Sequence, residues 1–372
     1  MASRSFHILV INWQDITHPL GGGAEVHFHE IFKRVVAAGH RVTLLSCHYQ
    51  DAPFEETLDG VRIVRRGQRD FFNYTVPRAY RELRARERID LVFDDLNKIP
   101  FYTPLFVKEP IVAIAHHFFG KHIFLEVSFQ YGSYVYLSEF LVRFIYRSTP
   151  FAVVSESTRA ELRHWGIKSE IDLLPNAVDL QRYEVLPGKK SSSPVIGYLG
   201  RIKKYKSVDH IIRAMPAIVE KIPDVMLKII GDGDALPELR QLARQLAVDK
   251  NVEFTGHVSH AEKVRLINES WIVVNPSSKE GWGLTVIESN ACRVPVVAAY
   301  SPGLIDSVID GKTGTLYEYG NITKLANSVV DLLQNHEKRE SLADNARRWA
   351  ERWNWDDSAA KAIRIIEKNV RM

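Results

Sequence analysis

The chain has 372 residues, of which 45% are hydrophobic and 25% charged, values typical of a globular protein. One hydrophobic core rarely serves so long a chain, so two domains are expected, and a net charge of +4 is too small to predict nucleic-acid binding. The apolar runs are far shorter than the ~20 residues that span a bilayer, and the N-terminus becomes polar too early for a signal peptide. With only two cysteines, the sequence predicts a cytoplasmic protein.

The first half alternates short apolar, β-branched runs with longer segments of helical periodicity, which predicts β-α-β units and a parallel sheet. Its expected helices include 24–38 and 74–87. Its expected strands are 7–12, 41–46, 61–65, 91–94, 111–115 and 152–155. The segment 186–194 is rich in Gly, Pro and Ser and is typical of a domain linker.

A second alternating series follows this linker. Its expected strands are 195–199, 226–230, 252–254, 272–274 and 294–298, and its expected helices are 208–221, 236–247, 261–269, 284–292 and those after 322. The pattern predicts two doubly wound α/β domains, an N-terminal one over 1–187 and a C-terminal one over 188–355. In such domains ligands bind at the carboxyl ends of the strands.

The strongest local signal is the segment 278–288, in which Gly281 and Gly283 precede a predicted helix. The first backbone N–H groups of that helix would be accessible to an anion. Glu280 lies before the helix and Glu288 inside it, and eight helical residues would separate them by about 12 Å. That separation exceeds the roughly 5–9.5 Å of a glycosidase carboxylate pair, so the two acids could hold different parts of one long ligand. On its own, the segment fits a loop–helix junction with surface glutamates equally well.

Two cations follow the strand predicted at 195–199. Arg201 and Lys206 stand before the next helix, where they could bind a diphosphate and stabilise it as it leaves. By themselves they fit a solvated basic turn better. The diphosphate hypothesis gains support because Glu280 and Glu288 follow later in the same predicted sheet and could line the same crevice.

Three weaker signals remain. The glycines at 21–23 open the first long helix, either as a loop that touches phosphate or as a plain helix start. Asp232 and Asp234 are spaced like an Asp-x-Asp metal site, but acidic residues are expected in a turn before a helix, so we expect no metal. His116 follows a buried strand and would face the crevice, although a lone histidine there is more often structural.

Taken in order, these segments resemble the retaining glycosyltransferases of family 4, which have the GT-B fold of two Rossmann-like domains facing a central cleft. The resemblance covers nearly the whole chain and rests on 21–23, 153–157, 174–179, Arg201 with Lys206, 230–233, 254–258 and the Glu280/Glu288 pair. Three departures from the family pattern weaken any transfer of donor specificity. They are Ala177 in place of glycine, Ser289-Asn290 in place of Ala-Met, and Arg293 where glycine is frequent.

The resemblance implies a role for each residue of the expected site. Arg201 and Lys206 would hold the donor diphosphate in place of a metal, and Glu288 would bind the ribose hydroxyls. Glu280 would contact the transferred sugar, and His116 would be the active-site histidine near that sugar.

Other parts of the chain would complete the donor site. The family pattern places Gly22 and Gly23 near the phosphates, and Val258 and Lys263 near the base. The remaining donor-binding residues would be Gly281, Trp282, Gly283 and Leu284, whose amides would meet the sugar and phosphate. The final helix, 356–372, would pack back on the N-terminal domain.

The resemblance also implies a reaction. It is the transfer of a hexose from a GDP-mannose or UDP-glucose type of donor, with retention and by front-face attack, without a metal or cofactor. A GT-B nucleotide-sugar 2-epimerase and a non-catalytic nucleotide-sugar-binding protein are the alternatives. The sugar, the base, the acceptor, the linkage and the oligomeric state are left open.

The acceptor side is suggested by aromatic residues interleaved with arginines over 118–147 and by nine arginines between Arg62 and Arg88. This composition fits a helix at a lipid interface. A buried aromatic helix beside an exposed basic one is the simpler interpretation. Our hypothesis is a glycan or lipid-linked acceptor, with peripheral docking on the inner, anionic face of the cell membrane.

Overall fold

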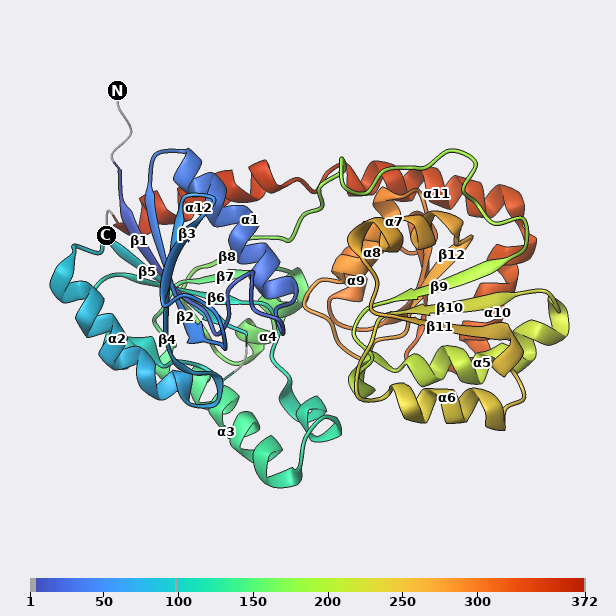
Figure 1. Cartoon of the computed structure of the whole chain (residues 1–372), viewed down its shortest axis with the longest axis horizontal. Coiled ribbons are helices and arrows are strands. Elements are labelled where there is room, and N and C mark those ends of the chain that lie inside the picture. Colours follow the sequence, from blue (N-terminus) through green and yellow to red (C-terminus); the bar gives the residue numbers. More distant parts are fainter. Residues whose placement is uncertain (1–4, 98, 371–372) are drawn as a thin grey trace. The chain divides into compact units, whose positions relative to one another are not determined.

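The computed structural model describes residues 5–97 and 99–370 and divides into two compact α/β units, coloured along the chain in Figure 1. The first unit consists of residues 1–176 and 355–372, and the second consists of residues 177–354. The division comes before the predicted boundary at residue 187. The reason lies in the contacts of that segment, because the Leu186 N–H donates to Asn268 and the Tyr183 hydroxyl donates to Glu288, both in the second unit.

The first unit is built on an eight-stranded sheet of order β3-β4-β2-β1-β5-β6-β7-β8. The strands are β1 (His7–Ile11), β2 (Arg41–His48), β3 (Glu55–Leu58), β4 (Val61–Gln68), β5 (Leu91–Leu96), β6 (Ile111–Ala115), β7 (Phe151–Val153) and β8 (Ile171–Leu173). All pairings are parallel except that of β3 with β4. The six predicted strands are confirmed, whereas the short strands β3 and β8 were not predicted.

Five α-helices accompany this sheet in the part of the chain that the structure describes. They are α1 (Gly23–Ala37), α2 (Phe72–Arg86), α3 (Phe129–Ile145), α4 (Glu156–His164) and α12 (Trp355–Val370). The last of them, α12, packs beside α1 (Figure 1). Arg34 Nε of α1 lies 2.6 Å from Asp356 Oδ1 of α12. The Ser358 hydroxyl donates to the Pro175 carbonyl, so the C-terminal helix is tied to the first unit at both places.

The second unit has a six-stranded sheet of order β11-β10-β9-β12-β13-β14, and its strands pair in parallel. The strands are β9 (Val195–Leu199), β10 (Met226–Ile230), β11 (Val252–Gly256), β12 (Ile272–Asn275), β13 (Val296–Tyr300) and β14 (Gly314–Glu318). The helices are α5 (Val208–Lys221), α6 (Leu236–Gln245), α7 (His260–Glu269), α8 (Leu284–Ala291), α9 (Leu304–Ser307), α10 (Ile322–Gln334) and α11 (His336–Ala350). The predicted elements are confirmed within a few residues, and β14 and α9 are additions.

The strand orders place a switch point in each sheet. In the second unit the chain builds outward from β9 to β11 on one side and from β12 to β14 on the other. The switch point lies between the neighbouring strands β9 and β12, and in doubly wound sheets a crevice forms at the carboxyl edge of this point. This edge carries the segments that hold Arg201, Lys206 and Glu280.

The central strands of the first unit are buried on both faces, yet β5 contains two buried acidic residues, Asp94 and Asp95. Asp94 is fully buried, and its Oδ2 accepts hydrogen bonds from the Tyr146 hydroxyl at 2.5 Å and from the Thr103 hydroxyl. Burial raises the pKa of Asp94 to about 6, although these two hydrogen bonds act in the opposite direction. The folded protein therefore binds a proton at Asp94 more tightly than the unfolded chain does.

This proton makes the stability of the protein depend on pH. Because the pKa of Asp94 is higher in the folded state than its ordinary 3.8, its contribution to the free energy of unfolding falls as the pH rises from about 4 to about 6. The loss amounts to about 3 kcal/mol. Asp94→Asn keeps an oxygen acceptor and should remove this dependence, so its stability relative to the wild type should increase over that range. Urea unfolding at pH 4, 5, 6 and 7 measures the difference in the free energy of unfolding between variant and wild type. Asp249→Asn, at an exposed aspartate, is the control. A constant difference between variant and wild type would contradict the prediction.

Candidate functional site

The loops that leave β9 and β12 meet through backbone and side-chain contacts. The Ser278 N–H and hydroxyl both donate to the Tyr205 carbonyl, at 3.0 and 2.9 Å. This pairing fixes the basic segment after β9 against the segment after β12 that contains Glu280. The two segments that the sequence predicted to line one crevice are thus in contact within the second unit.

Lys206 and Glu280 form an ion pair where these loops meet. Lys206 Nζ lies 2.6 and 2.8 Å from the two carboxylate oxygens of Glu280, and the Ser277 hydroxyl donates to the same carboxylate at 2.7 Å. Only 14% of each charged side chain is exposed. Burial disfavours the charge on Lys206, but the Glu280 carboxylate outweighs it and the pKa of Lys206 is raised. A diphosphate that binds Lys206 would therefore compete with Glu280.

Arg201 differs from Lys206 in its surroundings. It follows β9 on an exposed backbone turn, and among residues 5–97 and 99–370 no carboxylate pairs with it. Arg201 therefore supplies a cation that is not already neutralised. An exposed, unpaired guanidinium is suited to bidentate binding of phosphate oxygens.

The Gly-Asp-Gly segment after β10 supports this turn by close backbone packing. A Cβ at Gly231, where φ is +140°, would lie 2.0 Å from the Gly200 carbonyl oxygen, and one at Gly233 would lie 2.2 Å from the Ile202 carbonyl oxygen. Asp234 pairs with Lys203 at 2.6 Å. The glycines thus have a structural explanation. Within the described residues, no group of three or more His, Cys, Asp or Glu side chains could hold a metal ion.

The loop between β12 and α8 also requires glycine. Gly283 has a φ of +79°, and a Cβ there would lie 2.6 Å from the Ser307 hydroxyl oxygen. A Cβ at Gly303 would lie 2.3 Å from the Glu280 carbonyl oxygen. The helix α8 begins at Leu284, directly after Gly283. The Trp282 side chain is buried against Trp353, so only the backbone of Trp282 can meet a ligand.

Glu288 lies inside α8 and has two partners. Its Oε1 accepts hydrogen bonds from the Tyr183 hydroxyl at 2.5 Å and from Lys263 Nζ at 3.0 Å. Lys263, which was expected near the base, thus contacts Glu288, the residue expected to bind the ribose hydroxyls. Tyr183 was missed, because it lies 105 residues before Glu288 in the sequence and no motif connects them. Val258 lies half-buried between β11 and α7.

His116 lies in the first unit, after β6. It is buried, and its Nε2 lies 3.1 Å from Asp95 Oδ1. Burial disfavours the imidazolium, but the carboxylates of Asp95 and Glu25 together outweigh it, so the pKa of His116 is raised. The neighbouring ring of His27 lies 5.1 Å away, and burial and the charge of His116 lower the pKa of His27 to about 3. His116 is therefore suited to donate hydrogen bonds.

The glycine loop before α1 has an acidic partner, Glu25, which the sequence did not predict. The Gly22 N–H donates to Glu25 Oε2 at 2.6 Å, and α1 begins at Gly23. This is one half of a capping box, in which an acid three residues into the helix accepts from the backbone of the cap, and glycine has no side chain to accept in return. A phosphate at Gly22 would compete with Glu25. The spacing of Gly22 and Glu25 is the signal that could have revealed this contact.

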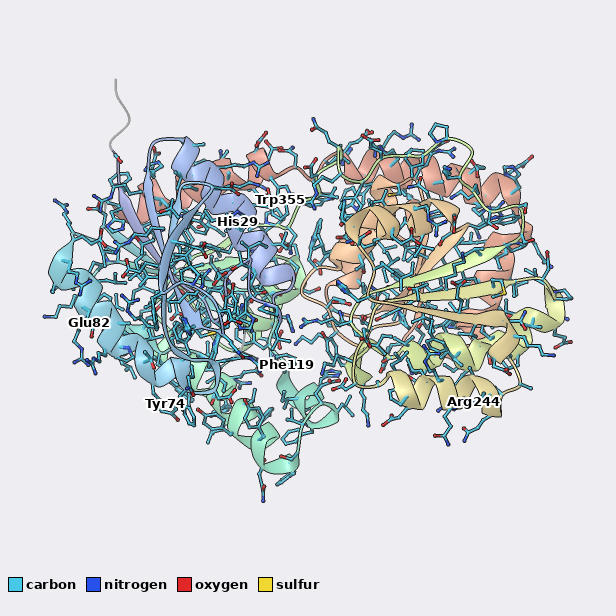
Figure 2. All side chains as sticks on the ribbon, viewed as in Figure 1. His29, Tyr74, Glu82, Phe119, Arg244 and Trp355 are labelled. Atoms are coloured by element: carbon cyan, nitrogen blue, oxygen red, sulfur yellow. The ribbon has the colours of Figure 1, made fainter. Side chains whose placement is uncertain are left out.

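The interpretation of 118–147 as a buried aromatic helix is wrong. Figure 1 shows α3 protruding from the first unit, and many of its apolar side chains are exposed. The exposed residues, which we call the α3 apolar face, are Phe129, Tyr131, Tyr134, Tyr136, Leu137, Phe140, Leu141 and Phe144. Tyr74 of α2, labelled in Figure 2, extends it, because its hydroxyl lies 3.3 Å from that of Tyr134. No helix in the described part of the chain has the length and apolar character needed to cross a membrane.

Known protein families match both parts of the chain. The family described as Glycosyltransferase Family 4 matches residues 21–182, and that described as Glycosyl transferases group 1 matches residues 183–349. A GDP-mannose-dependent alpha-(1-6)-phosphatidylinositol monomannoside mannosyltransferase of Mycolicibacterium smegmatis is 29% identical over 57% of this chain and 60% of its own length. Glycogen synthase of Mycobacterium tuberculosis is 26% identical over 96% and 94%. The chain thus spans about three fifths of the first relative.

Solved structures agree in fold. Sucrose-phosphate synthase from Thermosynechococcus elongatus gives a TM-score of 0.85 at 20% identity and covers 98% of each chain. Anabaena HepE in complex with UDP-glucose gives a TM-score of 0.75 at 18% identity, with 97% of this chain and 99% of the other covered. WaaG, a glycosyltransferase involved in lipopolysaccharide biosynthesis, gives 0.75 at 19% identity, with 96% and 99% covered. With both family matches and two parallel-sheet units, the chain belongs to glycosyltransferase family 4 and has the GT-B fold.

Proposed function

We propose that this enzyme transfers a hexose, with retention and without a metal ion, from a GDP-mannose or UDP-glucose type of donor to a glycan or lipid-linked acceptor. The observation that carries the proposal is the meeting of Arg201, Lys206 and Glu280 at the carboxyl edge of the second sheet, with Glu288 in the helix that follows. The two cations are suited to bind a diphosphate. The two acids are suited to accept hydrogen bonds from the hydroxyls of the sugar and of the ribose, which lie on either side of the diphosphate. The names of two relatives, a GDP-mannose-dependent mannosyltransferase and a glycogen synthase, support a hexose donor.

In this proposal the protein residues bind and orient rather than form a covalent intermediate. Arg201, Lys206 and the first amides of α8 hold the diphosphate and stabilise its charge as the bond to the sugar breaks. The acceptor oxygen forms the new bond on the same face of the sugar, and its proton passes to the leaving phosphate. His116 donates a hydrogen bond to the transferred sugar, consistent with its raised pKa. The 2-epimerase and the non-catalytic binding protein are less favoured, because the relatives named above are transferases and synthases.

Donor binding in the absence of metal is the first test. UDP-, GDP- and ADP-sugars are added in the presence of EDTA, and the melting temperature is measured. A donor at a hundred times its dissociation constant should stabilise the fold by about 2.7 kcal/mol. Arg201→Ala should abolish the shift, whereas Arg244→Ala, at an exposed arginine of α6 labelled in Figure 2, should leave it unchanged. A shift that appears only after a divalent ion is added would contradict metal independence.

Glu280→Gln tests the competition between Glu280 and a diphosphate for Lys206. Removal of the carboxylate charge leaves Lys206 free to bind phosphate, so a nucleoside diphosphate without sugar should bind about fivefold more tightly, equivalent to about 1 kcal/mol. The rate of transfer should fall, because the contact with the sugar is lost. Isothermal titration and product formation measure the two effects. Lys206→Met is the matched control and should weaken diphosphate binding. Unchanged or weaker diphosphate binding in Glu280→Gln would show that the two do not compete.

For the acceptor, we propose a lipid-linked substrate and peripheral docking at the inner face of the cell membrane through the α3 apolar face. Exposed aromatic side chains are typical of helices that lie at a lipid interface. Exposed arginines on α2, among them Arg78, Arg81 and Arg86, add a charge that attracts anionic headgroups. The Mycolicibacterium smegmatis relative is named for a phosphatidylinositol monomannoside, and WaaG for lipopolysaccharide biosynthesis.

Liposome binding tests the docking surface. The protein should sediment with anionic vesicles at low salt and much less with neutral vesicles. Phe129 and Phe144 are 77% and 63% exposed, and replacing both with serine should lower the partition coefficient at least about tenfold, because each buried phenylalanine contributes about 1.5–3 kcal/mol. Tyr300→Ser, at a tyrosine that is 64% exposed in the second unit, is the control. Equal binding by the double variant and the wild type would exclude this face as the docking surface.

A further inference from the structure

The two carboxylate oxygens of Glu288 have different surroundings. Oε1 accepts one hydrogen bond from the Tyr183 hydroxyl and one from Lys263 Nζ, at 2.5 and 3.0 Å. No residue in the described part of the chain donates to Oε2. Glu288 is 7% exposed, so little solvent reaches the carboxylate. The difference between the oxygens is therefore set by protein side chains.

Tyr183 and Lys263 also contact each other, which fixes the direction of the hydrogen bonds. Lys263 Nζ lies 2.6 Å from the Tyr183 hydroxyl oxygen, and an ammonium can only donate. The single hydroxyl proton of Tyr183 is therefore directed at Glu288. Burial and the neighbouring Glu288 carboxylate raise the pKa of Tyr183, so the phenol keeps this proton.

The Tyr183 ring is itself held in place. It is 7% exposed and makes an edge contact with the His260 ring at 5.0 Å between centroids. Lys263 Nζ lies 5.0 Å from the centre of the same ring. Tyr183 thus presents its hydroxyl from a fixed position, and Glu288 has one orientation in which Oε1 meets both donors.

This arrangement limits what Glu288 can bind. A carboxylate with both oxygens free can accept a hydrogen bond from each of two neighbouring hydroxyls. At Glu288 the two partners occupy Oε1, which blocks the contact in which each carboxylate oxygen accepts from one hydroxyl, and only Oε2 is left for a ligand. On the proposed function, the ligand at this position is the ribose of the donor nucleotide, which carries two neighbouring hydroxyls.

We propose that Tyr183, together with Lys263, is a positioning residue that restricts Glu288 to one of the two ribose hydroxyls, which Glu288 contacts through Oε2. The inference rests on the proposed function, because it assumes a nucleotide at this position. Recognition of the ribose is then asymmetric. Loss of the contacted hydroxyl weakens binding, whereas loss of the other has little effect.

The test measures this asymmetry directly. UDP, GDP and ADP are titrated calorimetrically into the wild type, and the one that binds is compared with its 2′-deoxy and 3′-deoxy forms. One deoxy form should bind about tenfold more weakly and the other within about twofold of the parent, because only one of the two hydroxyls donates to the charged carboxylate. In Tyr183→Phe, Oε1 regains a free acceptor position, so the two deoxy forms should differ by less than about threefold.

Two further variants separate positioning from general stability. Tyr317→Phe removes a buried hydroxyl that has no hydrogen-bond partner among the described residues of the same unit, and it should keep the wild-type asymmetry. Lys263→Met removes the other donor to Oε1 and should reduce the ratio of the two deoxy affinities, as Tyr183→Phe does. It therefore provides an independent test if Tyr183→Phe folds poorly. A merely structural role would lower the melting temperature and leave the ratio of the two deoxy affinities unchanged.

The outcomes are distinguishable. If no diphosphate binds the wild type, the donor site of the proposed function is wrong, and the inference fails with it. If a diphosphate binds but its two deoxy forms are equal in the wild type, or if their ratio persists in both Tyr183→Phe and Lys263→Met, the proposed function stands and the role of Tyr183 is wrong.

Discussion

The direction of the strands is the constraint on which the candidate site depends. In a parallel sheet every strand ends at the same edge, and β9 and β12 are neighbours in the sheet, so the loops that follow them begin side by side. Residues far apart in the sequence therefore gather there without any motif that joins them. Lys206 and Glu280, separated by 74 residues, meet for this reason, and a reversal of either strand would separate them.

Close backbone packing then fixes the positions of the loops at this edge. The contacts of Gly231 with the Gly200 carbonyl and of Gly303 with the Glu280 carbonyl leave no space for a side chain. On this backbone the charged side chains form two ion pairs, Lys206 with Glu280 and Lys263 with Glu288, whereas Arg201 keeps an exposed charge.

The sequence predicted most of this framework because β-branched runs, helical periodicity and glycine positions are local properties. It did not predict β3, β8 and β14, since strands of three to five residues with acidic or polar side chains carry little pattern. It placed Lys206 and Glu280 in one crevice but could not show that they pair. Tyr183 was not predicted because its importance comes only from its distance to Glu288. Glu25 was not predicted as a partner of the glycine loop because glycine is not among the usual first residues of a capping box.

The paired charges change how donor binding must be understood on the proposed function. A diphosphate that reaches Lys206 takes the place of the Glu280 carboxylate, which is then free to accept a hydrogen bond from the sugar. Binding of the phosphate and of the sugar are thereby coupled, and an intact donor satisfies both Lys206 and Glu280. After transfer the diphosphate alone leaves Glu280 without a sugar partner, and the carboxylate competes again for Lys206. Competition between Glu280 and the phosphate for Lys206 would thus favour the substrate over the product and promote release of the diphosphate.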